Sequence, residues 1–164
     1  MRGFEIWLTI RGVATPVQPA HTWEVADMDV QVSEFLQADR HAILATNGRK
    51  GAPQLTPVWY IYEDGVFYVS AQTRTVKVKN LRRDPTVTIC IDGGRGDARY
   101  VALYGKAELI EPGERQRDLR WRIVRHYYAD EATAARYYET VKDTVGVIVT
   151  LRPERIVSMG FGQS

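Results

Sequence analysis

Residues 66–92 read VFYVSAQTRTVKVKNLRRDPTVTICID, and the fold depends on how this stretch divides into elements. The apolar runs VFYVSA (66–71) and TVTICID (86–92) each predict a buried strand. Between them, residues 73–85 carry five Lys and Arg side chains and a single acid. This basic segment predicts one short helix that ends at Pro85, because proline cannot continue a helix.

The basic segment has two interpretations. A helix that begins directly after a strand offers unpaired N–H groups and a partial positive charge to a phosphate. Thr73 and Thr75 would add hydroxyl donors, and Lys77 would add a full charge. The alternative is a solvated basic helix face, and the residues alone favour it.

Upstream of this stretch, the pattern predicts a helix and two strands. DVQVSEFLQAD (29–39) is amphipathic and begins at the N-cap candidate Asp29. HAILAT (41–46) predicts a strand, and an Asn-Gly turn follows it. QLTPVWYIYE (54–63) predicts the next strand, which Pro57 places at an edge or a bulge. Asp64 and Gly65 then predict a tight turn into residues 66–71.

Downstream, residues 98–111 predict a long strand with a bulge at Gly105. Residues 112–143 predict a helical segment, with Pro112 at its first position. One face of this segment is apolar at fourfold spacing, at Leu119, Ile123 and Tyr127. The final strands are expected in VGVIVTL (145–151) and RIVSMGF (155–161).

Strands dominate this order, and most of their connections are short. The pattern predicts a mainly β, α+β fold, an antiparallel barrel with peripheral helices. Neither GxGxxG nor GxxxxGK[ST] occurs, so neither glycine-rich phosphate-binding motif is present. The 164 residues suggest one domain, residues 27–164, after an N-terminal extension, residues 1–26. Met28 is a candidate first residue of the native product.

Composition excludes several classes of function. The net charge of +2 gives no support to a nucleic-acid partner. The single cysteine, Cys90, allows no intramolecular disulfide, which suits a reducing, cytoplasmic location. No segment has the roughly 20 apolar residues of a membrane span. His21, His41 and His126 lack metal-ligand spacing, so no metal site is expected.

No side chain stands out as a catalytic nucleophile or as one of an acid–base pair. Asp118, Glu131 and Glu139 lie in an Arg-rich helical segment, where solvated ion pairs are the simpler interpretation. If the protein is an enzyme, its chemistry is expected to come from a cofactor.

The order of these elements resembles the pyridoxamine 5′-phosphate oxidase-like split-barrel superfamily over roughly residues 29–160. KNLRRDP (79–85) and YGKAEL (104–109) are the most specific motifs. Within the superfamily, the chain looks most like the B type of the flavin/deazaflavin oxidoreductases (FDOR-B), which use coenzyme F420. The resemblance implies an FMN-binding split-barrel fold and a homodimer with the cofactor at its interface.

The resemblance also implies a set of cofactor-binding residues. The second strand would lie along the flavin ring, the third strand and the following turn would hold the phosphate, and the start of the long strand would reach the cofactor of the partner subunit. These positions are, in chain order, Gln54, Thr56, Pro57, Val58, Trp59, Ser70, Arg74, Thr75, Lys77, Asn80, Arg99 and Tyr100. Asn80 would support the site from behind. Many relatives have Arg where this chain has Thr75, and Arg74 is the candidate replacement.

Three functions follow from the resemblance. The first is hydride transfer from reduced F420 to a small conjugated organic substrate. The second is an FMN-dependent oxidoreductase, although the chain ends RPERIVSMGFGQS, without the Trp- and Arg-rich tract that grips substrate in pyridoxamine phosphate oxidases. The third is a non-catalytic flavin- or haem-binding protein, with His41 or His126 as the candidate haem ligand.

Overall fold

The computed structural model describes residues 7–10, 13–16, 21–23 and 29–161. In this part of the chain the elements are β1 (Trp7–Ile10), β2 (Val13–Pro16), β3 (His21–Trp23), α1 (Val30–Gln37), β4 (Ala42–Thr46), β5 (Gln54–Val58), β6 (Tyr60–Glu63), β7 (Val66–Gln72), α2 (Val76–Arg83), β8 (Thr86–Asp92), β9 (Tyr100–Ile110), α3 (Glu114–His126), α4 (Glu131–Val141), β10 (Gly146–Leu151) and β11 (Arg155–Met159).

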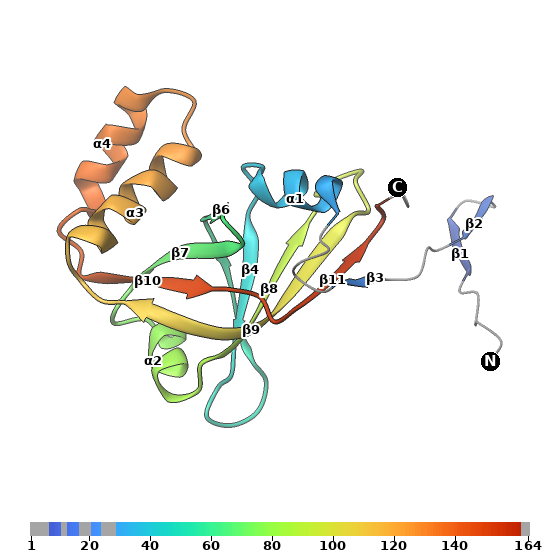
Figure 1. Cartoon of the computed structure of the whole chain (residues 1–164), viewed down its shortest axis with the longest axis horizontal. Coiled ribbons are helices and arrows are strands. Elements are labelled where there is room, and N and C mark those ends of the chain that lie inside the picture. The colour runs from blue at the N-terminus through green and yellow to red at the C-terminus, as the bar shows by residue number, and fades with distance from the viewer. Residues whose placement is uncertain (1–6, 11–12, 17–20, 24–28, 162–164) are drawn as a thin grey trace.

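One curled antiparallel sheet forms the body of the protein (Figure 1). Its strands follow the order β5-β4-β8-β9-β10-β7-β6, and β11 and β3 extend it beside β9. The main core lies against β4, β7, β8 and β9 and includes Leu44, Phe67, Ile89 and Leu103, all fully buried. The predicted antiparallel split barrel of the α+β class is therefore confirmed.

Strand β9 connects the two halves of the sheet. One edge of β9 pairs with β8 in unbroken register from Tyr100 to Lys106. The other edge pairs first with β11 and then with β10. Gly105 lies where these partners change, and a Cβ there would lie 2.9 Å from Leu151 Cδ1. The predicted bulge at Gly105 is wrong, because β8 pairs across it without an insertion. Glycine is needed there because residues 151–154 of the same chain pass so close to it.

The segment 54–63 forms two strands instead of the single strand that its pattern predicts. Strands β5 and β6 lie at opposite ends of the sheet order, and only Trp59 separates them in sequence. Pro57 pairs with Ile43 on β4, and β5 pairs with no other strand in the described residues. The predicted edge position of Pro57 is confirmed, and it suits a residue without an N–H group.

The expected turn and the first helix are confirmed. Asp64 and Gly65 have φ values of 50° and 75°, as a tight two-residue hairpin turn requires. Asp29 caps α1, since its Oδ1 accepts a hydrogen bond from the Gln31 N–H at 2.7 Å.

The helical segment 112–143 contains two helices. Asp130 interrupts it and caps α4 by accepting a hydrogen bond from the Thr133 N–H at 2.8 Å. Helix α3 begins at Glu114 after the N-cap Gly113, so Pro112 precedes the cap and its predicted place inside the helix is wrong. The predicted apolar face is confirmed: Leu119 and Ile123 pack with Ile61 and Ile148, and Tyr127 lies against this cluster. Figure 1 shows α3 and α4 side by side over the β7 and β10 end of the sheet.

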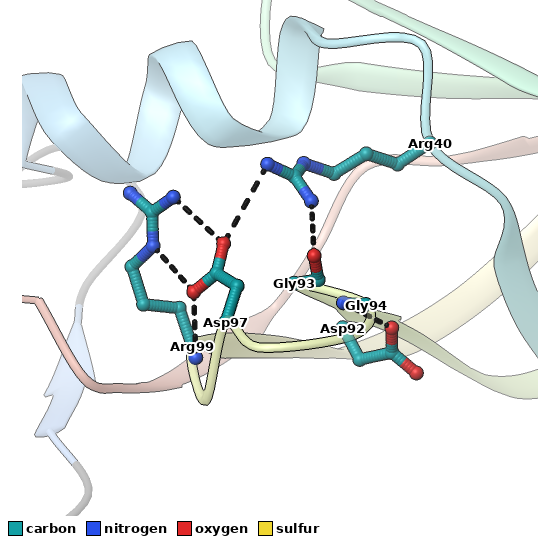
Figure 2. Close-up of polar contacts among 6 residues, drawn as sticks. All are labelled: Arg40, Asp92, Gly93, Gly94, Asp97 and Arg99. Carbon is teal, nitrogen blue, oxygen red and sulfur yellow. Dashed lines mark hydrogen bonds and ion pairs between the residues drawn. The ribbon is translucent and has the colours of Figure 1, made fainter.

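A polar cluster fastens the β8–β9 loop beneath α1 (Figure 2). The Arg99 guanidinium donates from Nε and Nη2 to the two oxygens of Asp97, at 2.9 and 2.7 Å. Arg40, which follows α1, donates to the Gly93 carbonyl at 2.9 Å and lies 3.7 Å from Asp97. Both guanidinium groups lie over the Phe35 ring. These contacts join residues 35–40 to the β8–β9 loop, which is distant in sequence.

The predicted N-terminal extension contributes part of the sheet. Strands β1 and β2 pair with each other, and β3 pairs with β11 through Ile156↔Trp23. The predicted domain boundary at residues 26–27 and the candidate start at Met28 lie outside the described residues, so that division stays a prediction. Among the described helices, none is long and apolar enough to cross a membrane.

Candidate functional site

A pocket of about 600 Å³ lies where the ends of β5 and β7 meet the start of α2 and the α3–α4 hairpin. This volume is within the usual range for sites that bind small molecules and cofactors. Half of the predicted cofactor-binding residues line it: Pro57, Val58, Trp59, Ser70, Thr75 and Lys77. The fold therefore gathers residues from β5, β7 and α2, although their role in binding stays a prediction.

The start of α2 has the features of an anion site. Thr75 occupies the N-cap position, but its hydroxyl donates to the Gln72 carbonyl at 2.7 Å and caps no N–H group. The first turn contains no acid, so its N–H groups have no side-chain acceptor. Such a helix terminus offers donors and partial positive charge to a phosphate.

Lys77 adds a full charge at this helix terminus. Its side chain is half-buried in the pocket wall, and burial lowers the pKa of the ammonium group. No carboxylate in the described part of the chain forms an ion pair with it. The hydroxyl of Thr73, in the same connection, is buried without a hydrogen-bond partner. These groups fit a cofactor phosphate better than they fit a solvated helix face.

Gln54, Thr56 and Arg74 do not line the pocket. Gln54 and Thr56 share one face of β5 with Val58, and the Gln54 Oε1 is buried without a partner. Arg74 is exposed, and its Nε donates to Gln72 Oε1 at 3.2 Å.

Asn80 is buried on α2, behind the start of the helix. Its amide donates to the Thr46 hydroxyl at 3.1 Å and accepts from Arg83 at 3.3 Å. The side chain thus joins α2 to β4, where it fixes the orientation of the helix that carries Lys77.

Arg99 and Tyr100 lie elsewhere on the same subunit. The register Val58↔Ala42↔Ile91↔Val101 places the start of β9 three strands from the pocket, about 14 Å along the sheet. The Arg99 guanidinium also forms an ion pair with Asp97. The resemblance assigns both residues to the cofactor of the partner subunit, and that assignment stays a prediction.

Arg120 is the main pocket residue that the sequence did not indicate. It lines the pocket, is only 5% exposed and has no carboxylate partner among the described residues. Its Nη1 donates to the Val141 and Thr144 carbonyls at 3.0 and 2.8 Å, and burial lowers its pKa. With the oxygen of the Gln116 amide turned toward the guanidinium, Nε and Nη2 donate to that oxygen at 3.1 and 3.0 Å. The guanidinium thus satisfies the carbonyl end of α4.

The remaining wall is mostly apolar and aromatic. No local sequence pattern marks these residues, because they come from the α3–α4 hairpin and the residues after it, from β7 or from the segment before β4: His41, Ala71, Gln72, Ile123, Val124, Tyr137, Val141 and Thr144.

His41 contributes to the wall through Trp59. The Trp59 indole N–H donates to His41 Nε2 at 2.8 Å, so this nitrogen is occupied as an acceptor. That bond makes His41 a poor candidate for a haem ligand. Within the described residues, no group of three His, Cys, Asp or Glu side chains could hold a metal ion.

Comparison with known proteins identifies the family. The sequence profile described as pyridoxamine 5′-phosphate oxidase matches residues 28–159. The chain belongs to the pyridoxamine 5′-phosphate oxidase family. This family is part of a superfamily of flavin-binding oxidoreductases, and the start of α2 lies inside the matched region.

Solved structures agree with this family assignment. A conserved hypothetical protein from Mycobacterium tuberculosis is 26% identical, with a TM-score of 0.67 over 84% of this chain and 93% of that one. A protein described as an F420 reductase is 19% identical, with a TM-score of 0.60 over 76% of this chain and 94% of that one. An FAD-binding protein from Mesorhizobium loti is 16% identical, with a TM-score of 0.60 over 88% of this chain and 100% of that one. The last two similarities show a shared fold.

Proposed function

We propose that this chain is an F420-dependent oxidoreductase that reduces a small conjugated organic substrate. The observation that supports this proposal most directly is the Lys77 ammonium group, which has no ion-pair partner among the described residues. It lies beside the uncapped start of α2, in a pocket of about 600 Å³. The resemblance to the F420-using flavin/deazaflavin oxidoreductases and the shared fold of a protein described as an F420 reductase support this choice of cofactor.

Each segment of the pocket has a distinct part in this proposal. Lys77 and Ser70 would bind the cofactor phosphate together with the first N–H groups of α2, whereas the Thr75 hydroxyl is already bonded to the Gln72 carbonyl. Pro57 and Val58 lie along the ring, where the edge position of β5 leaves the backbone open to a flat ligand.

When bound, reduced F420 would supply a hydride to a conjugated carbon of the substrate, and a solvent proton would complete this two-electron reduction. The chain orients the two molecules, and its apolar wall, which includes Ile123, Val124 and Val141, excludes water from the ring.

The functional unit in this proposal is a cytoplasmic homodimer with the cofactor at its interface. Leu55 on β5 and Val76 on α2 are 63% and 55% exposed on two elements that contact each other beside the pocket. Apolar side chains of this kind are suited to a subunit interface. Light scattering should give twice the chain mass, and Leu55→Glu should shift the protein to monomer.

Cofactor titration tests the proposal. F420 and FMN would be added separately to the native protein, Lys77→Met and Lys79→Met, and binding would be followed by calorimetry. Lys79 is the matched control, because it is an exposed lysine on the same helix that does not line this pocket. A charge-assisted hydrogen bond contributes about 1.5–3 kcal/mol, so Lys77→Met should weaken F420 binding by about 10- to 150-fold.

The outcomes separate the alternatives. Tight F420 binding that is lost only in Lys77→Met, followed by oxidation of reduced F420 in the presence of a conjugated substrate, supports the proposal. Preferential FMN binding would instead identify an FMN-dependent enzyme or flavin carrier, which the family also accommodates. Binding of neither cofactor would refute the assigned site.

A further inference from the structure

Two aromatic rings form a corner inside the pocket. Trp59, between β5 and β6, and Tyr137 on α4 both line the pocket, with centroids 5.5 Å apart and planes inclined by 52°. Tyr137 is 37% exposed although it is a large aromatic residue. We call Trp59 and Tyr137 the aromatic corner. An inclined pair of this kind can contact a flat ligand on its face and on its edge at once.

The Trp59 ring is held rigidly from behind. Its N–H donates to His41 Nε2 at 2.8 Å, and Tyr127 stacks on it at 4.8 Å with an interplanar angle of 9°. Tyr127 is itself fixed, since its hydroxyl donates to the Arg40 carbonyl at 2.6 Å and accepts from the Tyr60 N–H at 3.1 Å. A ring that is already ordered loses little entropy when a ligand stacks on it.

The charge of the pocket limits which ligands can use this corner. Aromatic rings can bind cations as well as other flat rings. The charged side chains that line the pocket are Lys77 and Arg120, and its described lining contains no Asp or Glu. A cationic ligand would therefore meet repulsion, whereas a neutral or anionic flat ligand would not.

We propose that the aromatic corner is the substrate subsite, and that it selects flat conjugated rings without positive charge. The inference rests on the proposed reaction, because it assigns the anion site at α2 to the cofactor and the aromatic corner to the substrate. It also changes the expected role of Trp59, from a cofactor contact to a substrate contact.

Three small probes of similar size test the selection. 2-Naphthoate is flat and anionic, decahydro-2-naphthoate is anionic but saturated, and 2-naphthylmethylammonium is flat but cationic. Equilibrium dialysis of the full chain, with and without F420, should show 2-naphthoate binding at least about fivefold more tightly than either of the others. Equal binding of all three probes would overturn the inference.

Variants locate the binding. Trp59→Leu and Tyr137→Ser should each weaken 2-naphthoate binding about three- to tenfold. Tyr137 is exposed, so its variant tests the corner even if Trp59→Leu folds poorly. Trp121→Leu is the matched control, because Trp121 contacts Tyr138 on α4 and does not line this pocket. Unchanged binding in Tyr137→Ser and in folded Trp59→Leu would refute the aromatic corner as the subsite.

The same experiment distinguishes this inference from the proposed function. Binding of 2-naphthoate to the F420-loaded protein supports separate substrate and cofactor sites. Competition between 2-naphthoate and F420 would assign the aromatic corner to the cofactor ring and overturn the inference, while F420-dependent reduction would still stand. Failure of the native protein to bind F420 would instead refute the proposed function, whatever the probe results.

Discussion

Replacing Arg120 with methionine should loosen the contact between α3 and the end of α4. The Arg120 side chain is buried on α3, and its Nη1 donates hydrogen bonds to the Val141 and Thr144 carbonyls at 3.0 and 2.8 Å. These carbonyls lie at and beyond the end of α4, where the helix has no further N–H donors and carries partial negative charge. Methionine keeps an apolar stem but has no donor.

The size of the effect follows from these contacts. A hydrogen bond from a charged donor contributes roughly 1.5–3 kcal/mol, so two of them amount to about 3–6 kcal/mol. Methionine avoids the cost of burying the polar group, roughly 1–3 kcal/mol in proteins. We therefore expect the free energy of unfolding to fall by about 2–3 kcal/mol in Arg120→Met.

Urea denaturation followed by circular dichroism measures this change. Arg115→Met is the matched control, because Arg115 is exposed in the first turn of the same helix. Hydrogen exchange should also become faster in residues 138–146 of Arg120→Met and stay unchanged in the control. A loss below about 1 kcal/mol, or an equal loss in Arg115→Met, would refute the argument that Arg120 fastens the hairpin.

Three further predictions test other contacts. Gly146→Ala should lower the free energy of unfolding by about 2 kcal/mol or more in urea denaturation, because its Cβ would lie 2.0 Å from Arg120 Nη2; a neutral result would show that Arg120 can move away. Asp97→Asn should destabilise the protein at pH 7, because Arg99 holds the Asp97 pKa at about 2. The urea midpoints of the variant and the native protein should converge as pH falls from about 4 to about 2. A difference in midpoint that stays constant over this range would contradict this cause. Inorganic phosphate binding, measured by calorimetry, should weaken as rising pH removes the Lys77 charge, and it should do so at a lower pH than an ordinary lysine would give. The Lys77→Arg variant should keep binding phosphate to higher pH. Identical pH profiles for the native protein and this variant would exclude Lys77 as the phosphate-binding cation.

The sequence predicted those elements whose signals are local. Residues 66–92 divide into β7, α2 and β8 as expected, because Pro85 and the apolar runs mark their ends. The break at Trp59 had no such signal, since Trp59 is as apolar as its neighbours. Its position depends on Tyr127, which is distant in sequence and stacks on the indole.

The residues of the candidate site also differ in whether a local sequence signal marks them. Lys77 and Thr75 could be identified because the phosphate-binding pattern lies within one short segment. Arg120 could not, because it belongs to an Arg-rich helix in which Arg115, Arg117 and Arg122 look the same in sequence but are exposed. Only the packing of α3 on the sheet and the end of α4 distinguish it.

The link between β5 and β6 has a mechanical consequence. These strands are the two ends of the sheet path, yet a single residue, Trp59, joins them. Any widening or narrowing of the curled sheet must therefore change the backbone at Trp59, and the indole of this residue forms one wall of the pocket. Ligand binding at that wall would restrict the widening and narrowing of the whole sheet. Protection from hydrogen exchange should therefore extend to strands that the ligand does not contact.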